Sequence, residues 1–348
     1  MRSIVSGAAR WMAAALVCAG ALASSCSERP GAGAGDVVLY VSADDYVVRP
    51  IVGAFEEESG LRVRVLGDTE ATKTTGLVQR LRTERENPRA DVFWSSEVFL
   101  TIRLAEEGLL APLEDASLEV WPSGLADGDR LWHGFANRAR VVVYNTEFVS
   151  PEAAPRTMHD LLDERWRGRV GVARPAFGTT RGHMGLALEA WGEDAFRVWA
   201  QALQANGVRL YDGNASVVRA VASGEIRVGL TDTDDVWSGQ RNGWPIDLVY
   251  VRHDLDGRAM GTMVIPNTVA IVDGGPNAEA GRRLALFLLS ERVERMLAES
   301  DSHNVPIRPE VAADFPAYSV PDPMGVDPVR IAARMDAALA ILDDEWTQ

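Results

Sequence analysis

Short apolar runs and longer amphipathic segments alternate along the first third of the chain. Residues 37–41 and 92–94 are apolar throughout, and residues 61–66 alternate between apolar and basic side chains. Such runs are typical of strands that are buried on both faces or on one. The stretches that carry apolar residues at helical spacing are 48–58, 75–85 and 98–107. The alternation of strands and helices predicts an α/β fold with a parallel sheet and right-handed crossovers.

The same alternation returns in the second part of the chain. Further strands are predicted at 141–144, 170–173, 208–211, 227–230 and 262–272. Further helices are predicted at 184–191, 195–205, 216–223, 277–290, 291–300 and 329–342. We therefore expect two α/β lobes, because a chain of this length suggests about two domains. Lobe 1 is predicted to comprise 37–137 plus 259–315, and lobe 2 to comprise 138–258 plus 316–348.

The first 25 residues have the character of an export signal. Arg2 and Arg10 give a basic start, an apolar run covers 11–23, and small residues precede Cys26. A cysteine in this position predicts a lipidated N-terminus, and ordinary secretion is the alternative. Residues 26–36 are rich in glycine, proline and alanine and are predicted to be a tether.

Composition excludes several classes of function. The formal net charge is −15, which argues against nucleic acid as a partner because phosphates demand basic surfaces. The chain has no GxGxxG, P-loop, HExxH or GxSxG motif, so we expect a binding protein and not an enzyme. After loss of the signal only one of the two cysteines remains, so no intrachain disulfide is expected, and we expect a monomer.

Three carboxylates crowd into residues 231–235, directly after the predicted strand 227–230. They belong to Asp232, Asp234 and Asp235. Acids at the end of a strand lie at the carboxyl edge of the sheet, where α/β proteins bind ligands. Carboxylates this close repel one another unless a cation or a hydrogen-bond donor holds them. The segment predicts a ligand-binding role, and the alternative is that the acids cap the following helix.

A second candidate region lies between a predicted strand and the helix at 184–191. Thr179 and Thr180, near a helix N-terminus, could help to hold an anion, or could simply cap the helix. Arg181 and Arg140 could pair with an anionic group of a ligand. Asn214, between the strand 208–211 and the helix 216–223, is the remaining candidate ligand-binding residue of this half.

Short motifs in a fixed order run through nearly the whole chain after the tether. They occupy 38–40, 54–61, 90–94, 107–112, 138–141, 165–170, 218–226 and 264–268. In this order and spacing the chain resembles the solute-binding proteins of ABC importers, and most closely the ferric-iron-binding periplasmic family. The resemblance implies two lobes that close around a ligand and an ABC permease in the cytoplasmic membrane as partner.

The resemblance also indicates which positions would hold the ligand. The family holds iron with a histidine, a glutamate and a pair of tyrosines, and these positions fall here on Asp44, Ser96 (with Glu97 adjacent), Asp234 and Asp235. None of them keeps the family residue. Oxygen ligands suit hard ions, so the expected cargo is Fe³⁺ or a divalent cation, with Asp44, Asp234 and Asp235 as metal ligands.

One position of the resemblance argues against a bound anion. Some family members hold a small anion through an asparagine that corresponds here to Asp232, and a carboxylate at this place would repel such an anion. The alternatives are an amine- or phosphonate-type organic solute, such as an aminophosphonate, whose two charges would satisfy the acids and the arginines together, or a sensor module for a membrane receptor.

Overall fold

A computed structural model describes residues 36–68, 74–176, 178–255, 258–325 and 327–346. The predicted signal, Cys26 and all of the predicted tether except Asp36 lie outside the described residues. Asp36 is the first residue of a strand. No helix among the described residues is both long and apolar enough to span a membrane.

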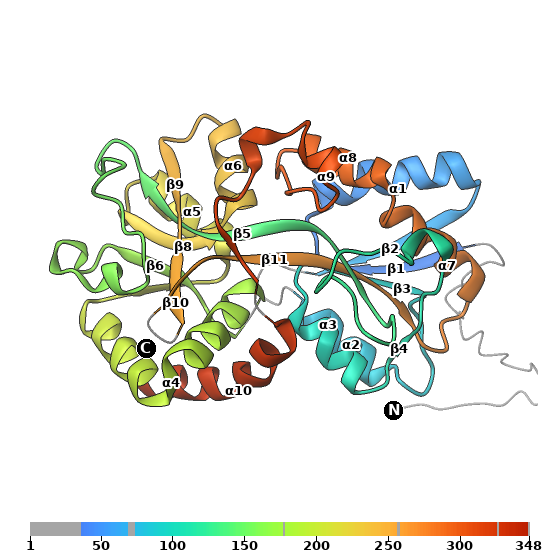
Figure 1. Ribbon diagram of the computed structural model, residues 1–348, viewed down its shortest axis with the longest axis horizontal. Helices are drawn as coiled ribbons and strands as arrows, with labels where there is room; N and C mark the ends of the chain where they lie inside the picture. Colours follow the sequence, from blue (N-terminus) through green and yellow to red (C-terminus); the bar gives the residue numbers. More distant parts are fainter. Residues whose placement is uncertain (1–35, 69–73, 177, 256–257, 326, 347–348) are drawn as a thin grey trace, which may run out of the picture.

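The strands of the described chain form one continuous curled sheet (Figure 1). They are β1 Asp36–Val41, β2 Arg62–Gly67, β3 Val92–Ser95, β4 Leu110–Ala111, β5 His133–Asn145, β6 Val170–Ala173, β7 Arg209–Tyr211, β8 Val228–Asp232, β9 Ile246–Tyr250, β10 Arg252–Leu255, β11 Arg258–Val272 and β12 Pro323–Met324. Their main order is β2-β1-β3-β11-β5-β8-β6-β7. Strands β4, β10 and β12 pair with β11, and β9 pairs with β5.

Helices cover both faces of this sheet (Figure 1). They are α1 Asp45–Ser59, α2 Thr75–Thr83, α3 Phe99–Glu106, α4 Gly178–Ala205, α5 Asn214–Ala222, α6 Thr233–Arg241, α7 Ala278–Leu288, α8 Glu291–Glu299, α9 Pro309–Ala312 and α10 Pro328–Glu345. The predicted α/β class with two lobes is therefore confirmed. The residue boundaries assigned to each lobe stay a prediction.

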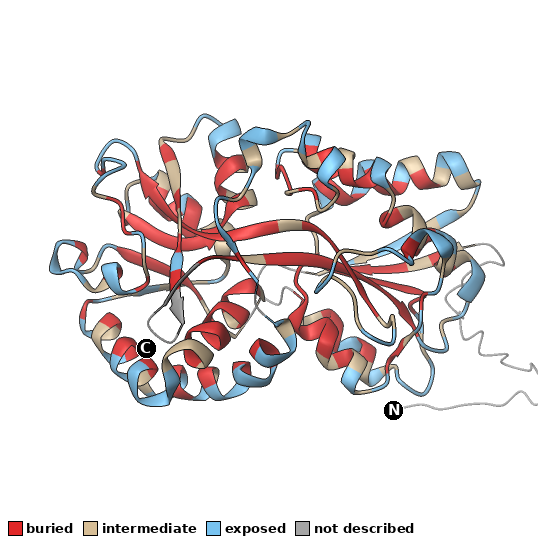
Figure 2. Ribbon diagram, in the orientation of Figure 1, coloured by how far each residue is buried: buried red, intermediate tan, exposed pale blue. Residues whose placement is uncertain are grey.

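Alternating side chains of single strands build the cores on the two faces. In β1, Val37 and Leu39 pack in one apolar cluster with residues of α1, α7 and α8, while Tyr40 packs in another with residues of α2 and α3. In β5, Val141 joins a cluster with α5, whereas Val142 joins one with α4 and α10. Because both faces are covered, these strands are buried along nearly their whole length (Figure 2).

The sheet is mixed and not purely parallel, which corrects the sequence-based expectation. Strand β1 pairs in parallel with β2 and β3, and β6 pairs in parallel with β7 and β8. The long strands β5 and β11 run antiparallel to each other and to β8 and β3 respectively. Apolar patterning identifies a buried strand but carries no information about its direction, so the antiparallel pair was not foreseen.

Two boundaries differ from the predicted elements for identifiable reasons. Strand β5 begins at His133, well before the predicted 141–144. The apolar pattern did not reveal its first half, because that half contains His133, Arg138 and Arg140, which are polar and nevertheless buried. Element α4 begins at Gly178, earlier than predicted, and contains the two helices predicted at 184–191 and 195–205, which are separated by a kink at Gly192, whose φ of 77° is not helical. Glycine adopts such an angle without steric penalty.

Candidate functional site

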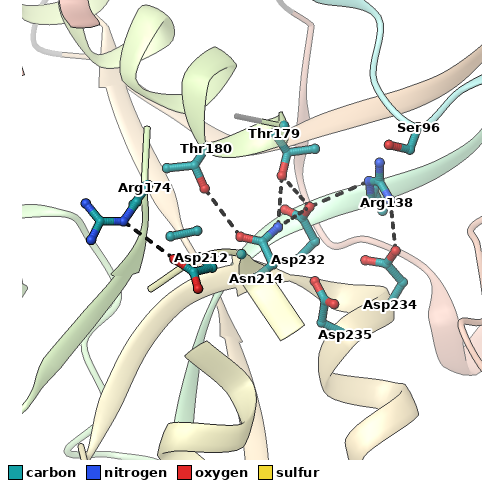
Figure 3. Close-up of a pocket in the computed structure, with 13 residues that line it drawn as sticks. Ser96, Arg138, Arg174, Thr179, Thr180, Asp212, Asn214, Asp232, Asp234 and Asp235 are labelled. Atoms are coloured by element: carbon teal, nitrogen blue, oxygen red, sulfur yellow. Dashed lines mark hydrogen bonds and ion pairs between the residues drawn. The ribbon is translucent and has the colours of Figure 1, made fainter. Parts of the chain in front are cut away.

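A pocket lies where the carboxyl ends of β6 and β8 meet the N-termini of α4, α5 and α6 (Figure 3). Ser96, which follows β3 of the other half of the molecule, closes one side of it. Its charged lining consists of Arg138, Arg174, Asp212, Asp232, Asp234 and Asp235. Four aspartates and two arginines give this lining a formal charge of −2, so its electrostatic balance favours a positive ligand.

Asp232 is the most strongly held acid of the pocket. It is the last residue of β8 and 1% exposed. One carboxylate oxygen, Oδ1, accepts a hydrogen bond from Nη1 of Arg140 at 2.6 Å. The other, Oδ2, accepts from Thr179 Oγ1 at 2.6 Å and from Asn214 Nδ2 at 2.9 Å. The side chain makes no capping hydrogen bond to α6, so the alternative of a helix cap does not describe Asp232.

Arg140 brings a full positive charge into the interior behind Asp232. The residue is 0% exposed, and its Nη1 also donates to Thr179 Oγ1 at 3.1 Å. Its Nε donates to His183 Nδ1 at 3.1 Å, and His183 Nε2 lies 2.7 Å from His253 Nε2. Burial lowers the pKa of both histidines, that of His253 to about 4. The imidazoles are therefore neutral near pH 7, and Asp232 is the hydrogen-bonded counter-charge of Arg140.

Arg138 lies two residues earlier on β5, so it projects to the same face of the strand. Its Nη1 donates to Asp234 Oδ2 at 2.9 Å, and its Nε lies 3.6 Å from Asp232 Oδ2. Burial alone would lower the pKa of Arg138, but the carboxylates of Asp234 and Asp232 raise it overall. Arg138 thus partly neutralises the acidic cluster.

The three acids of residues 231–235 converge as their spacing suggested. Asp232, Asp234 and Asp235 each offer a carboxylate oxygen, and these oxygens lie within 4.8 Å of one another. Oxygens bound to one ion at 2.0–2.6 Å lie no farther apart than about twice that distance. Asp235 also accepts a hydrogen bond from Thr231 Oγ1 at 3.2 Å. The cluster has the donors and the span that a hard cation requires.

Glu97 and Ser96 are adjacent in sequence but have different surroundings. Ser96 lines the pocket, and its Oγ lies 3.1 Å from Ser42 Oγ. Glu97 does not line the pocket: its carboxylate accepts hydrogen bonds from the backbone N–H groups of Phe99 at 2.7 Å and Leu100 at 3.2 Å. These are the first residues of α3, so Glu97 satisfies donors that the helix leaves open. Burial raises the pKa of Glu97 to about 7.

Asp44 lies outside the group of three acids, although it was expected to join Asp234 and Asp235. It stands at the N-cap of α1, makes no side-chain capping bond, and lines a separate cavity between α1 and β2. A tyrosine two residues later connects the regions. Partial desolvation, followed by the carboxylates of Asp44, Asp234 and Asp235, raises the pKa of Tyr46, which stays 46% exposed.

The anion-binding residues expected from the sequence separate into two sets. Thr179, Thr180 and Asn214 line the pocket and bond to one another: Asn214 donates to Thr179 Oγ1 at 3.0 Å, and Thr180 Oγ1 donates to Asn214 Oδ1 at 3.3 Å (Figure 3). Arg181 does not join them, because its Nη2 donates to Asp336 Oδ1 on α10 at 2.6 Å. Gly178 enters α4 with a φ of 54°, an angle that glycine adopts readily.

Several residues of the site were not identified from the sequence. Arg138 and Arg174 supply its positive charge, and Asp212 pairs with Arg174 at 3.6 Å. The spacing of two between Arg138 and Arg140 within an otherwise buried strand was the available signal for Arg138. For Tyr46 there was none, because its relation to Asp234 depends on contacts between distant parts of the chain.

The sequence of this chain is similar to those of bacterial proteins named for iron uptake and for 2-aminoethylphosphonate binding. The chain is 28% identical over 312 residues to iron uptake protein A1 of Synechocystis, covering 84% of this chain and 85% of that protein. It is 27% identical over 270 residues to a candidate 2-aminoethylphosphonate-binding periplasmic protein of Salmonella typhi, covering 76% and 75%.

A similar fold occurs in the crystal structure of iron-bound HitA from Pseudomonas aeruginosa. The TM-score is 0.78, the identity is 24%, and the alignment covers 90% of this chain and 99% of that one. Residues 87–327, well over half of the chain, match a family described as bacterial extracellular solute-binding protein. The chain belongs to this family of extracellular solute-binding proteins.

Proposed function

We propose that the protein captures a hard cation, with Fe³⁺ as the first candidate and a divalent ion as the next, and presents it to an ABC permease. The observation that carries the proposal is the convergence of the Asp232, Asp234 and Asp235 oxygens within 4.8 Å. Relatives named for iron uptake support it, and so does the negative lining of the pocket. Capture and release involve no chemistry on the cargo.

The size of the pocket favours a small ligand. The space open to the centres of water-sized molecules is ≈ 40 Å³, which holds on the order of three waters. A cation with part of its hydration shell fits this volume. The carboxylates of Asp234 and Asp235 lie in the first turn of α6, so they would contact the ion from the β8 side.

Closure of the two lobes would complete the site. Ser96 comes from the half of the molecule that contains β3, whereas the three acids belong to the half that contains β8. A cation held by the acids could draw Ser96 and the phenol of Tyr46 toward it, and the ligand would then stabilise the closed form by its differential affinity. The permease would recognise that form.

The protein would act at the cytoplasmic membrane. Lipidation of Cys26 would keep the protein at the outer side of the cytoplasmic membrane, and the monomer is the proposed functional unit. A sensor module that presents its closed form to a membrane receptor would use the same capture step. A neighbouring permease gene would favour import, and a neighbouring histidine kinase gene would favour sensing.

A zwitterionic organic solute is the second candidate. The observation that favours it is the presence of Arg174 and the N-terminus of α5 in the same lining as the acids. An anionic group could bind there while an ammonium group meets Asp234 and Asp235. The volume and the net negative lining fit a bare cation better.

The test combines metal analysis of the purified protein with binding measurements on a paired variant. Asp234→Asn with Asp235→Asn should abolish the thermal stabilisation by Fe³⁺ supplied as its nitrilotriacetate complex. In the unchanged protein this stabilisation should reach about 2.7 kcal/mol at about 100 times Kd. The matched control is Asp343→Asn with Asp344→Asn, another adjacent pair that is exposed on α10.

Equal binding by both paired variants would contradict the assignment of the acids. If Fe³⁺, Mn²⁺, Ca²⁺ and Mg²⁺ all fail to stabilise the unchanged protein against thermal unfolding and 2-aminoethylphosphonate stabilises it, the zwitterionic solute is the cargo. Urea unfolding of each variant without ligand shows whether loss of binding reflects loss of the fold.

A further inference from the structure

We propose that Asp232 is a built-in anion: its carboxylate fills the place where a small free anion would otherwise bind, so that cation capture needs neither phosphate nor carbonate. The inference rests on the proposed function, because it concerns what accompanies the cation. It assigns Asp232 a different role from Asp234 and Asp235, although all three belong to one cluster.

The Asp232 carboxylate lies where two helices begin. Its Oδ2 accepts hydrogen bonds from Thr179, in the first turn of α4, and from Asn214, the first residue of α5. Two helix N-termini therefore face this carboxylate. Helix N-termini favour negative charge through their open N–H groups and their dipoles. The place has the donors of an anion site, and a side chain of the protein fills it.

The positive charge that balances the Asp232 carboxylate comes from Arg140. Arg140 is fully buried, and its Nη1 donates to Asp232 Oδ1 at 2.6 Å. A second nitrogen of the Arg140 guanidinium, Nε, donates to the neutral ring of His183. Among the described residues, Asp232 is thus the anion hydrogen-bonded to Arg140. A free anion at this place would be redundant for charge balance.

A second anion would find little room and little available positive charge in the pocket. The oxygens of Asp234 and Asp235 lie within 4.8 Å of an oxygen of Asp232, so a phosphate beside them would meet three carboxylates. Arg138 is already paired with Asp234 at 2.9 Å. The open space of ≈ 40 Å³ is also small for a cation together with a tetrahedral oxyanion.

Replacing Asp232 by alanine should turn the built-in anion site into a vacant one. Alanine removes the carboxylate together with the space that it fills, so Arg140, Thr179 and Asn214 lose their shared acceptor. A small anion should then bind near Arg140 and the two helix N-termini. Asp235→Ala removes the same charge and bulk from the same cluster without touching Arg140, so it is the matched control.

The first measurement is calorimetric titration of the cation-free protein with inorganic phosphate. The unchanged protein and Asp235→Ala should bind it weakly or not at all, and Asp232→Ala should bind it at least about tenfold more tightly. Equal gains by the two variants would overturn the proposal, because a general loss of negative charge would then suffice. No gain by a folded Asp232→Ala would overturn it as well.

The second measurement uses the unchanged protein and Fe³⁺ from its nitrilotriacetate complex, with and without phosphate or bicarbonate. The affinity should change by less than about twofold, and native mass spectrometry should find the metal without phosphate or chelator. A tightening of about tenfold or more by either anion, or a retained anion, would overturn the inference and leave the proposed function intact.

The two measurements separate the possible failures. If the unchanged protein binds no cation, the proposed function fails, and the phosphate titration of the metal-free protein still decides the role of Asp232. If Asp232→Ala does not fold because Arg140 has lost its counter-charge, the measurement on the unchanged protein decides alone.

Discussion

Asp232 and Glu97 are two buried carboxylates in similar places that are held in different ways. Asp232 ends β8, and Glu97 comes two residues after β3, and each is 1% exposed. Asp232 accepts a hydrogen bond from a buried arginine, whereas Glu97 accepts from the backbone of α3 and, among the described residues, from no cationic side chain.

Because the two acids are equally buried, the difference shows that the hydrogen-bond partner decides whether a buried acid caps a helix or belongs to a binding site. Burial raises the pKa of Glu97 to about 7, although the N–H groups of Leu100 and Phe99 oppose the shift. Glu97 can therefore be neutral near physiological pH, which suits a structural cap better than a cation ligand. Asp232 pairs with Arg140 and lies beside Asp234 and Asp235 in the lining of the pocket.

The largest effect is expected when the counter-charge of Asp232 is removed. Arg140→Met should lower the free energy of unfolding by up to about 3–5 kcal/mol, because it removes the hydrogen-bonded charge of a buried carboxylate and leaves it Arg138, whose Nε lies 3.6 Å away. Urea unfolding measures this. Adding Asp232→Asn should recover part of the loss, and a double variant that loses the sum of both single effects would show that the two residues are not coupled.

A smaller effect, dependent on pH, is expected at Glu97. The folded protein holds the proton of Glu97 more tightly than the unfolded chain, since the pKa rises from 4.5 to about 7. The stability that this group contributes is present below pH 4.5 and is lost as pH rises through about 7. Glu97→Gln should remove this trend, which amounts to at most about 3 kcal/mol.

Urea unfolding of both proteins from pH 4.5 to pH 8 isolates the contribution of Glu97. His183 and His253 have lowered pKa values, so their contribution has the opposite sign and is lost as pH falls. Because both proteins contain these histidines, the difference between the two curves reports Glu97. Parallel curves would mean that Glu97 is ionised in the folded protein throughout this range.

The smallest effect is expected at Arg181, which the sequence had suggested as a ligand residue. Its ion pair with Asp336 involves a carboxylate side chain that is 67% exposed, and such pairs contribute less than about 1 kcal/mol. Arg181→Met should leave cation affinity unchanged, as calorimetry can show. It should also raise the pKa of Glu97 further, because Arg181 now lowers it. Loss of cation binding by Arg181→Met would show that Arg181 contributes to the binding site after all.

The sequence predicted the class of fold and the edge at which the acids gather, because both depend on local patterns. The strand before Asp232 is apolar, and the acids follow it directly. Contacts between distant segments could not be foreseen in the same way. Arg140 and Asp232 are 92 residues apart and meet because β5 pairs with β8.

Glu97 illustrates the limit of local patterns. An acid after a strand and before a helix is expected equally for a ligand and for a cap, and only the position of its carboxylate relative to Phe99 and Leu100 distinguishes them. Asp44 has the same ambiguity: it precedes α1 as Asp232 precedes α6, yet it lines a different cavity.

Strand β5 changes its neighbour between two consecutive residues. Ala139 is the last residue that pairs with β11, and Arg140 is the first that pairs with β8. Arg138 and Arg140 therefore stand on opposite sides of this change of neighbour, although only one residue separates them. Their guanidinium groups nevertheless reach the same acidic cluster, through Asp234 and Asp232 respectively. The cluster thus links the segment of β5 that pairs with β11 to the segment that pairs with β8.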